Sequence, residues 1–522
     1  MPTNKKFYIT TPIYYASGQP HIGHAFSTIY ADVICRYKKL LGYDAIMQTG
    51  MDEHGQKIDQ AAKSNNLPTQ EYVNQISVHF EKLWKLLDID YKYFVRTSDP
   101  KHQQVVQQVF DEWQKANYIY LGKWEGLYCV KCEEPYTRIR AHLGESGKLL
   151  CEVGHELMKR TEPSYFFKMH EFESWIKDFY AKHPMFIVPK SRVSELTNSF
   201  LVEGLTDLSV SRINFDWGIP VLSDPKHVIY VWIDALLNYL TWLGYKQSDD
   251  HMFLEYWQNP DAEIVHVMSK EITRFHCIYW PIMLHCLNLR QPTRVISHGW
   301  IINKDTKMSK SLGNVINPIT YIDQFGSDAL RYFLMKELSL ESDMVFSHDL
   351  FNEVYNADLA NIYGNLVSRV MGMIQQYCHG TIITHPQVKQ DIYTTFIMST
   401  TELIDVCRSC INSFQIHELI KNVLTYAKSA NKAIEDVKPW QLFKDHSQPE
   451  LENFLFILAN VVRVISVLLA PILTVGTKII NQQMRFNPDQ LSLEQLLNFD
   501  LLHNHQIGES TPIYVRATNE KK

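Results

Sequence analysis

The chain opens with an alternation of strand-like and helix-like segments, and this pattern constrains its fold more than any other feature. Residues 7–11 are β-branched and aromatic, residues 23–41 have helical periodicity, and residues 44–49 form a second short apolar run. Further strand-like runs follow at residues 227–233, 263–267 and 294–297. Strands that alternate with helices form parallel sheets covered by helices. We therefore expect an α/β fold with a doubly wound parallel (Rossmann-like) sheet.

Two regions depart from this alternation. Short segments with turn residues and a cysteine cluster predict an inserted domain within the sheet, and an almost entirely helical region with periodic apolar residues predicts an all-α helical bundle. The expected division is residues 1–117 for the first half of the sheet domain, 118–225 for the inserted connective domain, 226–300 for the second half, 301–347 for a lysine-rich loop and connecting fold, and 348–522 for the bundle.

The composition excludes several classes of protein. A net charge of −6 over 522 residues argues against coating nucleic acid through bulk positive charge. The first residues lack the apolar core of a signal peptide, and the apolar run 461–475 is interrupted by Arg463 and Pro471, so we expect no membrane span. Nine cysteines without a secretory signal indicate reduced thiols and a cytoplasmic location.

A nucleotide site is predicted at His21-Ile22-Gly23-His24, between the first strand and the first helix. Unpaired N–H groups at a helix start favour anions, the two imidazoles add donors, and Gly23 leaves room for a flat ring. Two histidines in isolation are equally consistent with surface or capping residues. The arrangement fits ATP.

A second motif, Lys307-Met308-Ser309-Lys310-Ser311, lies nearly three hundred residues later, after the last predicted strand of the sheet. Lysines on a mobile loop can close over a triphosphate and neutralise charge on leaving pyrophosphate. A solvated basic turn is the alternative interpretation. The chain has no GxxxxGK[ST] motif, so chemistry at the α-phosphate is favoured over the usual γ-phosphate transfer.

The two motifs together resemble those of the class I aminoacyl-tRNA synthetases, which form an aminoacyl-adenylate from ATP with Mg²⁺ and pass the acyl group to tRNA. The resemblance sharpens to the methionyl-tRNA synthetases because it runs through ITTPIYYASGQPHIGHA, TGMDEHGQKI, YVWIDALLNYL and GWIINKDTKMSKSLGN. It implies ATP-dependent activation of L-methionine and its transfer to the 3′ end of tRNA(Met). It also implies that the bundle binds the anticodon.

The same resemblance implies a methionine pocket in which Asp52 receives the substrate ammonium. Its other members would be Ile13, Tyr15, Trp232, Leu236, Tyr239 and His276. Aromatic walls suit a polarisable thioether, and a carboxylate suits an ammonium group. Without the resemblance, Trp232 and Tyr239 would be interpreted as core aromatics.

The resemblance also implies an ATP site. The catalytic residues would be His21, His24, Lys307, Lys310 and Arg212, and the ATP-binding residues Gly23, Glu271, Met308, Ser309 and Ser311. Outside this resemblance, Arg212 would be a surface ion pair. The family's ribose-side segment usually reads Gly-Lys-Asp, whereas this chain has Ser269-Lys270-Glu271. Glu271 can accept hydrogen bonds from ribose hydroxyls, but its side chain is one methylene longer.

A zinc knuckle is predicted in the inserted domain from Cys129, Cys132, Cys151 and His155. Thiolates with one imidazole at such spacing suit tetrahedral Zn²⁺. Three residues separate the last two ligands, whereas the family usually has two, which leaves the identity of the fourth ligand open. The pair Cys407 and Cys410 lies in a helical pattern, which favours core packing.

In the helical region, the resemblance assigns anticodon binding to Asn365, Arg369 and Trp440. A guanidinium, an amide and an exposed aromatic ring can bond to and stack on unpaired bases. The ordinary interpretation is a solvated face for the first two and a core residue for Trp440. Lys421, Lys428 and Lys432 share one helical face and either meet phosphates or are simply solvated. We expect a monomer, because no C-terminal dimerisation barrel follows.

Two alternatives remain open. One is a sister class I synthetase for cysteine or a small aliphatic amino acid, although the editing insertion of the aliphatic enzymes would not fit in 522 residues. The other is a non-catalytic tRNA-binding paralogue. The presence of His21, His24, Asp52, Lys307 and Lys310 argues against this second alternative.

Overall fold

The structure is a computed structural model that describes residues 5–131, 134–136, 141–144, 147–303, 306–307, 316–337, 339–388, 391–487 and 492–517. Its centre is a six-stranded parallel sheet with the order β3-β2-β1-β14-β15-β9. The strands are β1 (Lys6–Tyr15), β2 (Asp44–Asp52), β3 (Tyr93–Arg96), β9 (Ile187–Val188), β14 (Glu263–Ser269) and β15 (Arg294–His298). This topology confirms the predicted doubly wound α/β fold.

Strand β1 lies inside the sheet and is covered on both faces. Phe7 and Ile9 belong to one apolar core and Tyr8 to another, because successive side chains of a strand point to opposite faces. A strand buried on both faces has a nearly continuous apolar sequence, which is why residues 7–11 could be recognised. The register with β2 shifts between Thr10 and Ile13, where Pro12 cannot donate a ladder hydrogen bond.

Helices cover the two faces of the sheet. The core on the Phe7 side includes α1 (Ile22–Leu40) and α3 (Thr69–Leu86), and the core on the Tyr8 side includes α4 (Pro100–Lys115), α7 (Val231–Thr241) and α9 (Trp280–Cys286). Shorter helices in this part are α2 (Gln56–Ser64), α5 (Glu173–Lys182), α6 (Ser191–Leu196) and α8 (His251–Phe253). Helices on both faces leave the carboxyl ends of the strands as the natural place for a ligand.

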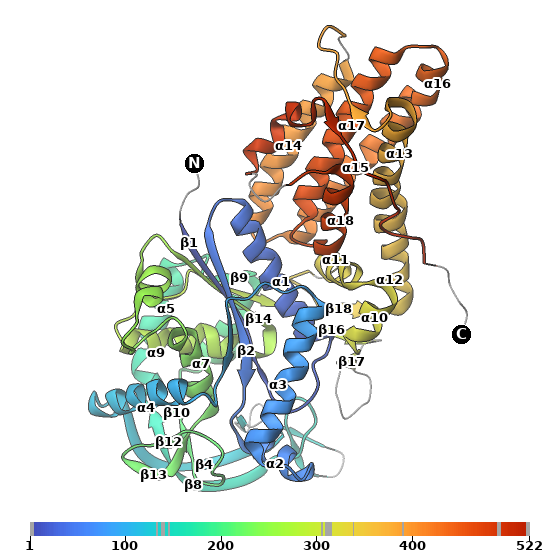
Figure 1. Cartoon of the computed structure of the whole chain (residues 1–522). Coiled ribbons are helices and arrows are strands. Elements are labelled where there is room, and N and C mark those ends of the chain that lie inside the picture. The colour runs from blue at the N-terminus through green and yellow to red at the C-terminus, as the bar shows by residue number, and fades with distance from the viewer. Residues whose placement is uncertain are drawn as a thin grey trace.

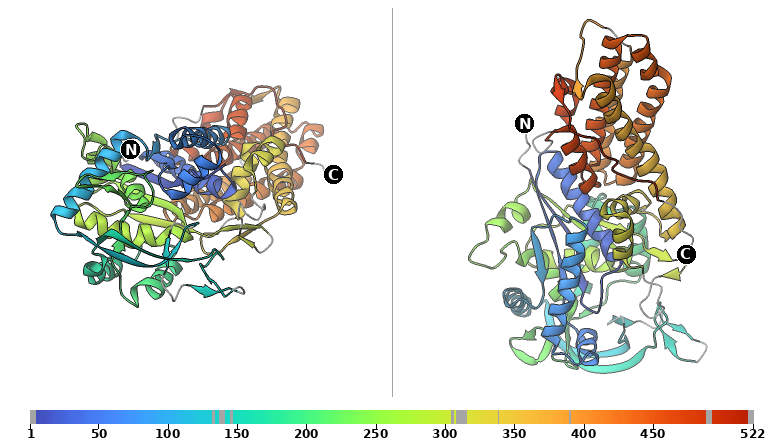
Figure 2. Two further views of the ribbon diagram at one scale, coloured as in Figure 1. Left: turned by 90° about the horizontal axis from the view of Figure 1, so that it is seen from below. Right: turned by 45° about the vertical axis from the view of Figure 1, so that its right-hand side comes forward.

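The region between β3 and α7 forms antiparallel sheets at the end of the molecule opposite the helical bundle (Figure 1; Figure 2). One sheet contains β10 (Leu208–Ser209), β8 (Met158–Phe167), β4 (Ile119–Cys129) and β5 (Glu134–Tyr136), and another contains β11 (Ser211–Arg212), β13 (Asp224–Ile229) and β12 (Pro220–Val221). A small hairpin joins β6 (His142–Leu143) to β7 (Leu149–Leu150). Strand β9 of the same region joins the parallel sheet.

The prediction of a strand of the parallel sheet at residues 227–233 is wrong. Strand β13 ends at Ile229 and pairs antiparallel with β11 and β12, and helix α7 begins at Val231. Helix α7 is buried along most of its length, so its sequence is a short apolar run that periodicity cannot distinguish from a strand.

After β15, a small sheet connects the α/β part to the bundle. It contains β16 (Ile301–Asn303), β17 (Thr306–Lys307) and β18 (Met344–Phe346), with α10 (Pro318–Phe325) and α11 (Ser327–Glu337) between the last two. Within α11, Arg331 is fully buried and donates to Asp32 of α1 at 2.6 Å and to the carbonyls of Pro471 and Ile472 at 2.6 and 2.9 Å. One guanidinium therefore joins the sheet domain to the bundle.

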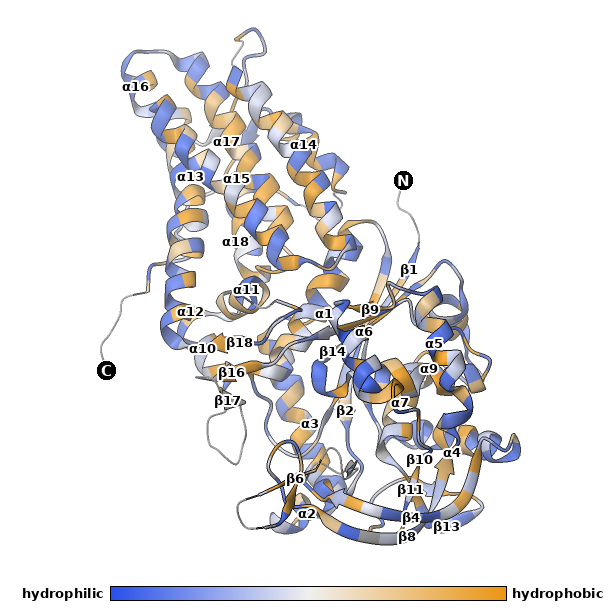
Figure 3. Cartoon of the chain, turned by 180° about the vertical axis from the view of Figure 1, so that it is seen from behind, coloured by the Kyte–Doolittle hydropathy of each residue, from blue (hydrophilic) through white to orange (hydrophobic). Residues whose placement is uncertain are grey.

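The bundle contains α12 (His348–Val354), a π-helical segment (Tyr355–Gly364), α13 (Asn365–Cys378), α14 (Asp391–Asn412), α15 (Ile416–Val437), α16 (Pro439–Lys444), α17 (Gln448–Leu469) and α18 (Thr474–Met484). Two short strands of this region, β19 (Thr381–Ile382) and β20 (His505–Gln506), pair antiparallel. Orange and blue alternate around several of these helices, as in amphipathic helices (Figure 3). The periodic pattern over residues 395–437 is interrupted at Phe414, whose φ is +62°.

Helix α17 is the one described helix whose length and apolar composition would suffice to cross a membrane. Its most apolar window is 94% buried by the rest of the chain. Helices α13, α14 and α15 pack around it. It is therefore the core helix of the bundle, as expected for residues 461–475.

Candidate active site

A cavity of about 430 Å³ opens at the carboxyl ends of β1, β2, β14 and β15. Eight predicted site residues line it: Ile13, Tyr15, His21, Gly23, His24, Asp52, Trp232 and Glu271. Parallel strands end at a common edge, so residues far apart in the sequence meet there. The cavity therefore brings four of the predicted nucleotide residues and most of the predicted methionine residues into one site.

The start of α1 is held by its own two histidines. Nδ1 of His21 accepts from the Gly23 N–H, and Nδ1 of His24 accepts from the His21 N–H, each at 3.1 Å. The two rings stack with centroids 3.7 Å apart. Because both Nδ1 atoms are acceptors, the proton of each neutral ring is on Nε2. The donor group of each histidine is therefore its Nε2–H.

A glycine at position 23 favours this arrangement. A Cβ at this position would lie 3.0 Å from Cε1 of the His21 ring. The absence of a side chain thus allows the imidazole to fold back over the helix start. The ring that lies beside Gly23 in the structure is that of His21, and the prediction that Gly23 leaves room for the flat ring of a nucleotide stays a prediction.

Asp52 is the last residue of β2 and is mostly buried in the cavity wall. It pairs in register with Tyr15, and the Ala16 N–H donates to its carbonyl at 2.9 Å. Lys57 lies 5.8 Å from the centre of the Tyr15 ring and also lines the cavity. A carboxylate on a rigid strand end is suited to bind an ammonium group in a fixed position.

The aromatic residues form a wall and a floor. Trp232 stacks on Phe275 with centroids 3.6 Å apart. Below it, the Tyr239 hydroxyl lies 2.7 Å from Nε2 of His276, and Nδ1 of His276 donates to the Ile272 carbonyl at 3.1 Å. Burial lowers the pKa of His276 to about 4. This neutral histidine therefore accepts from Tyr239.

Three predicted pocket residues lie in this floor and do not line the cavity itself. They are Leu236, Tyr239 and His276, which are 1%, 2% and 2% exposed. Their burial fits the interpretation of Tyr239 as a core aromatic, which the sequence had left open.

The predicted ribose-side segment is fixed by the connecting sheet. Lys270 Nζ lies 2.8 Å from both carboxylate oxygens of Asp343 and 4.1 Å from the centre of the Trp300 ring. The Trp300 indole N–H donates to Glu271 Oε2. Trp300 and Glu271 both line the cavity. The longer side chain of Glu271 therefore has a neighbouring donor that orients its carboxylate.

Arg212 lies in a smaller adjoining cavity with His54 and does not line the main one. Its guanidinium lies 4.6 Å from the centre of the Tyr230 ring, and Nη1 donates to Ser209 Oγ and the Ser211 carbonyl at 2.7 Å each. Among the described residues, none accepts from Nη2. The guanidinium thus retains donor capacity for an anion, and its predicted role stays a prediction.

The lysine-rich loop is largely outside the described residues. Lys310, Met308, Ser309 and Ser311 all lie outside them. Lys307 ends β17, which pairs antiparallel with β16 directly after the strand end occupied by His298 and Gly299. The backbone of the loop therefore begins beside the cavity wall formed by Trp300 and Ile301.

Comparison with known proteins identifies the family. The model for "tRNA synthetases class I (M)" matches residues 7–140 and 141–371. Methionine–tRNA ligase of Ureaplasma parvum is 46% identical over the full length of both chains. The chain belongs to the methionyl-tRNA synthetase family. The corresponding ligase of Mycoplasma genitalium is 42% identical over 99% of this chain and all of its own length.

A solved family member agrees in three dimensions. The methionyl-tRNA synthetase of Mycobacterium tuberculosis in complex with methionyl-adenylate is 32% identical and superposes with a TM-score of 0.93, covering 98% of this chain and all of that one. This likeness confirms the α/β domain with its inserted region and helical bundle. The family also excludes the alternative of a sister synthetase for cysteine or a small aliphatic amino acid.

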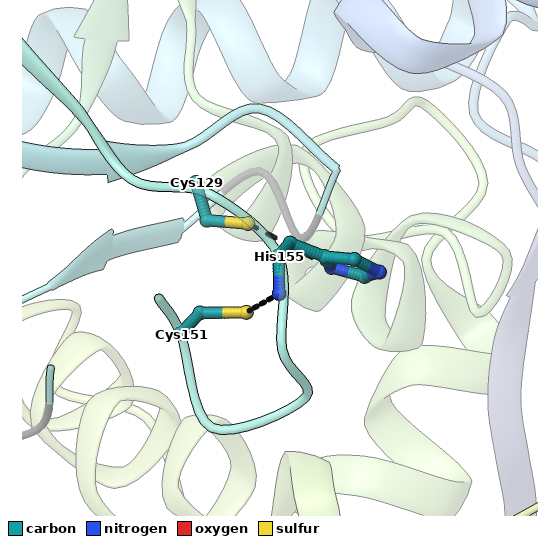
Figure 4. A group of neighbouring side chains, drawn as sticks. All are labelled: Cys129, Cys151 and His155. Carbon is teal, nitrogen blue, oxygen red and sulfur yellow. Dashed lines mark hydrogen bonds between the residues drawn. The ribbon is translucent and has the colours of Figure 1, made fainter. Parts of the chain in front are cut away.

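The predicted zinc knuckle is brought together in part. Atoms of Cys129, Cys151 and His155 that could bind a metal all lie within 4.8 Å of one another, with 3.9 Å between Cys129 Sγ and His155 Nδ1. Both sulfurs point toward His155, whose backbone N–H donates to Cys151 Sγ at 3.3 Å (Figure 4). Tetrahedral zinc would separate a sulfur from a nitrogen ligand by about 3.5 Å, so these residues fit Zn²⁺. Cys132 lies outside the described residues.

The three predicted anticodon residues lie along the bundle. Asn365 is exposed at the start of α13, and Arg369, one turn later, pairs with Glu435 of α15 at 2.7 Å. Trp440 follows on α16 with 36% of its surface exposed, whereas a core residue would be buried. Cys407 and Cys410 are buried in α14, which confirms core packing for them.

Several residues of the cavity wall were missed by sequence reasoning. Lys57, Lys131, Ser27, His298 and Trp300 all line it. Nε2 of His298 lies 2.8 Å from Ser27 Oγ and Nδ1 lies 2.8 Å from the Gly299 carbonyl. Burial lowers the pKa of His298 to about 4. Its position directly after a predicted parallel strand was the available signal.

Proposed function

We propose that this chain is a methionine–tRNA ligase that activates L-methionine with ATP to methionyl-adenylate and then transfers methionine to the 3′ end of tRNA(Met). The observation that carries this proposal is the single cavity that Asp52, Trp232, His21 and His24 all line. An ammonium acceptor and an aromatic wall suit one substrate, and a helix start with two imidazole donors suits the other.

In this proposal the methionine carboxylate attacks the α-phosphate of ATP and displaces pyrophosphate. His21 and His24 donate from Nε2 to the phosphates, Glu271 accepts from the ribose hydroxyls, and Arg212 stabilises charge on the adenylate. Mg²⁺ bound to ATP would supply further neutralisation of the phosphate charge. Positioning and charge stabilisation carry the rate, because no covalent intermediate with the enzyme is required.

The lysine-rich loop completes the site in this proposal. Lys307 and Lys310 neutralise charge on the leaving pyrophosphate, and Met308, Ser309 and Ser311 cover the nucleotide. Lys57 and Lys131 add positive charge to the cavity wall. Several cations around a polyphosphate stabilise the transition state more than the ground state, because charge accumulates on the leaving group.

For the remaining regions, we assign residues 118–225 to a connective domain whose knuckle binds structural Zn²⁺ through Cys129, Cys132, Cys151 and His155. We assign residues 348–522 to anticodon binding, in which Asn365 and Arg369 hydrogen-bond to unpaired bases and Trp440 stacks on one. Lys421, Lys428 and Lys432 are exposed on α15 and lie where a tRNA backbone could meet them. The enzyme acts as a cytoplasmic monomer.

The test is ATP–pyrophosphate exchange by the purified chain with each of the twenty amino acids in turn, without tRNA. Exchange stimulated chiefly by methionine would bear out activation and its specificity together. Stimulation by another amino acid would refute the pocket assignment. No stimulation by a folded sample would favour the non-catalytic tRNA-binding alternative.

Replacement of Lys310 by Ala tests the role of the loop. Adenylate formation should fall far more than methionine binding, because Lys310 acts on charge that develops in the transition state. Equal loss of binding and turnover would contradict that role. Lys115→Ala, on the exposed face of α4, is a matched control in which both quantities should be unchanged.

A further inference from the structure

The segment that follows Asp52 is anchored by a buried carboxylate. His54 Nδ1 lies 2.6 Å from Oδ2 of Asp234, and His102 Nε2 lies 2.8 Å from the other oxygen, Oδ1. His54 is 3% exposed, Asp234 1% and His102 0%. Asp234 is thus an acceptor that two imidazole N–H groups share in the protein interior.

The three residues come from three separate elements. His54 lies in the turn between β2 and α2, two residues after Asp52, while Asp234 lies in the first turn of α7, two residues after Trp232. His102 lies in α4. One carboxylate therefore ties the backbone that carries the ammonium-binding group to the helix that carries the aromatic wall.

The charge on Asp234 is maintained by these neighbours. Burial alone would raise the pKa of this carboxyl, but the two imidazoles outweigh burial and the pKa is lowered. Charge-assisted hydrogen bonds are shorter and stronger than neutral ones, in agreement with the 2.6 and 2.8 Å distances. The Asp234 carboxylate is therefore held between the two imidazoles.

The other hydrogen bonds of the turn that follows Asp52 connect it to elements other than α7. The Glu53 carboxylate accepts a hydrogen bond from Arg96 Nε of β3 at 2.7 Å. The backbone carbonyl of Trp217 accepts a hydrogen bond from the Gly55 N–H at 3.1 Å. These contacts hold the turn against β3 and the inserted region, whereas the contact of His54 with Asp234 connects it to α7. Strand β2 itself contacts α7 earlier, where Gln48 Nε2 donates to Asn238 Oδ1 at 2.5 Å, so the His54 contact is the described side-chain link that lies beyond Asp52.

We propose that His54 and Asp234 are positioning residues that set methionine affinity by fixing Asp52 relative to Trp232. This inference rests on the proposed function and on Asp52 as the acceptor of the substrate ammonium. Removing the hydrogen bond between His54 and Asp234 should weaken binding of the substrate ammonium group. Binding of the thioether and of the nucleotide should be unaffected. A displacement of about 1 Å in a binding group is enough to cost orders of magnitude in affinity or rate.

The experiment measures binding of two ligands to the full chain by equilibrium dialysis. One ligand is methionine, and the other is 4-(methylsulfanyl)butanoate, which keeps the thioether and carboxylate but lacks the ammonium. For His54→Ala and Asp234→Asn, the Kd for methionine should rise about tenfold or more, whereas the Kd for the analogue should change less than about twofold. In exchange assays, the KM for ATP should stay within about twofold of wild type.

A conservative variant separates positioning from general damage. Asn places an amide N–H close to where Nδ1 of histidine lies, so His54→Asn should recover most of the methionine affinity that His54→Ala loses. His385→Ala is the matched control for His54→Ala, because it removes an imidazole–carboxylate contact with Glu452 in the bundle. It should leave both Kd values unchanged.

Three outcomes would overturn the inference. They are unchanged methionine binding in His54→Ala, equal losses for methionine and the analogue, and no recovery in His54→Asn. A wild-type chain that binds methionine but shows no exchange would refute the ligase activity alone. The binding comparison among variants would still decide the positioning role in that case.

Discussion

The hydroxyl of Tyr239 is the donor that satisfies Nε2 of His276, over 2.7 Å in the floor of the cavity. Because Nδ1 of His276 donates to Ile272, this second nitrogen must accept, and Tyr239→Phe removes its donor. An unsatisfied buried acceptor costs ~1–3 kcal/mol, so we expect that loss in the free energy of unfolding. Denaturant unfolding measures it, and a variant as stable as wild type would contradict this hydrogen-bond assignment.

Acid should destabilise the protein through the same histidine. The pKa of His276 is lowered from 6.5 to about 4 by burial, so between these values the unfolded chain binds a proton that the folded chain does not. The unfolding free energy therefore falls as pH falls through this window, by about 1.4 kcal/mol per pH unit for each such group. Urea unfolding from pH 7 to pH 4.5 measures the slope.

The matching variant for this pH effect is His276→Gln, which has no titrating ring. Its stability should depend less steeply on pH by the contribution of one proton, while His298 keeps its own contribution. An unchanged slope would show that the acid sensitivity arises elsewhere.

The knuckle should bind one zinc ion per chain. Metal analysis of the purified protein checks the stoichiometry, and Cys151→Ser should abolish binding because a hydroxyl is a poor substitute for a thiolate ligand. Loss of zinc should loosen the small core around Leu127, Tyr136 and Leu157, and hydrogen exchange would detect this locally. Full zinc content in Cys151→Ser would contradict its assignment as a ligand.

Removing the buried Arg331 should destabilise the whole chain. Arg331→Met leaves Asp32 and three carbonyl acceptors without this donor, and breaking a buried ion pair costs ~3–5 kcal/mol. Lys115→Ala breaks an exposed pair with Asp111 and should cost less than ~1 kcal/mol. Thermal unfolding of the two variants compares them directly, and similar losses would contradict the structural role of Arg331.

The sequence predicted the elements that depend on local pattern. The first strand was recognisable because β1 is apolar on both faces, and the first helix because α1 begins within the motif His21-Ile22-Gly23-His24. Helix α7 was misread in part, because a helix buried all round resembles a strand over a short window. The break between α14 and α15 at Phe414 could not be predicted from periodicity, since a single residue with positive φ leaves the periodic pattern unchanged.

Sites were predictable where a motif and a strand end coincide. Asp52 and His21 met both conditions and lie in the same cavity. The pairing of His54 with Asp234 joins residues 180 positions apart, and nothing in either local sequence indicates it. Such contacts depend on how elements pack, which propensity and periodicity do not describe.

The order of strands in the central sheet also bears on synthesis of the chain. Strand β1 pairs with β2 on one side, but its other edge waits for β14, where Phe7 meets Glu263. At ribosomal speeds of ~5–20 residues per second, roughly 13–50 seconds pass before that partner is made. An apolar strand edge left unpaired for so long can join another chain. The nascent protein therefore carries one unpaired edge of β1 until β14 has been made.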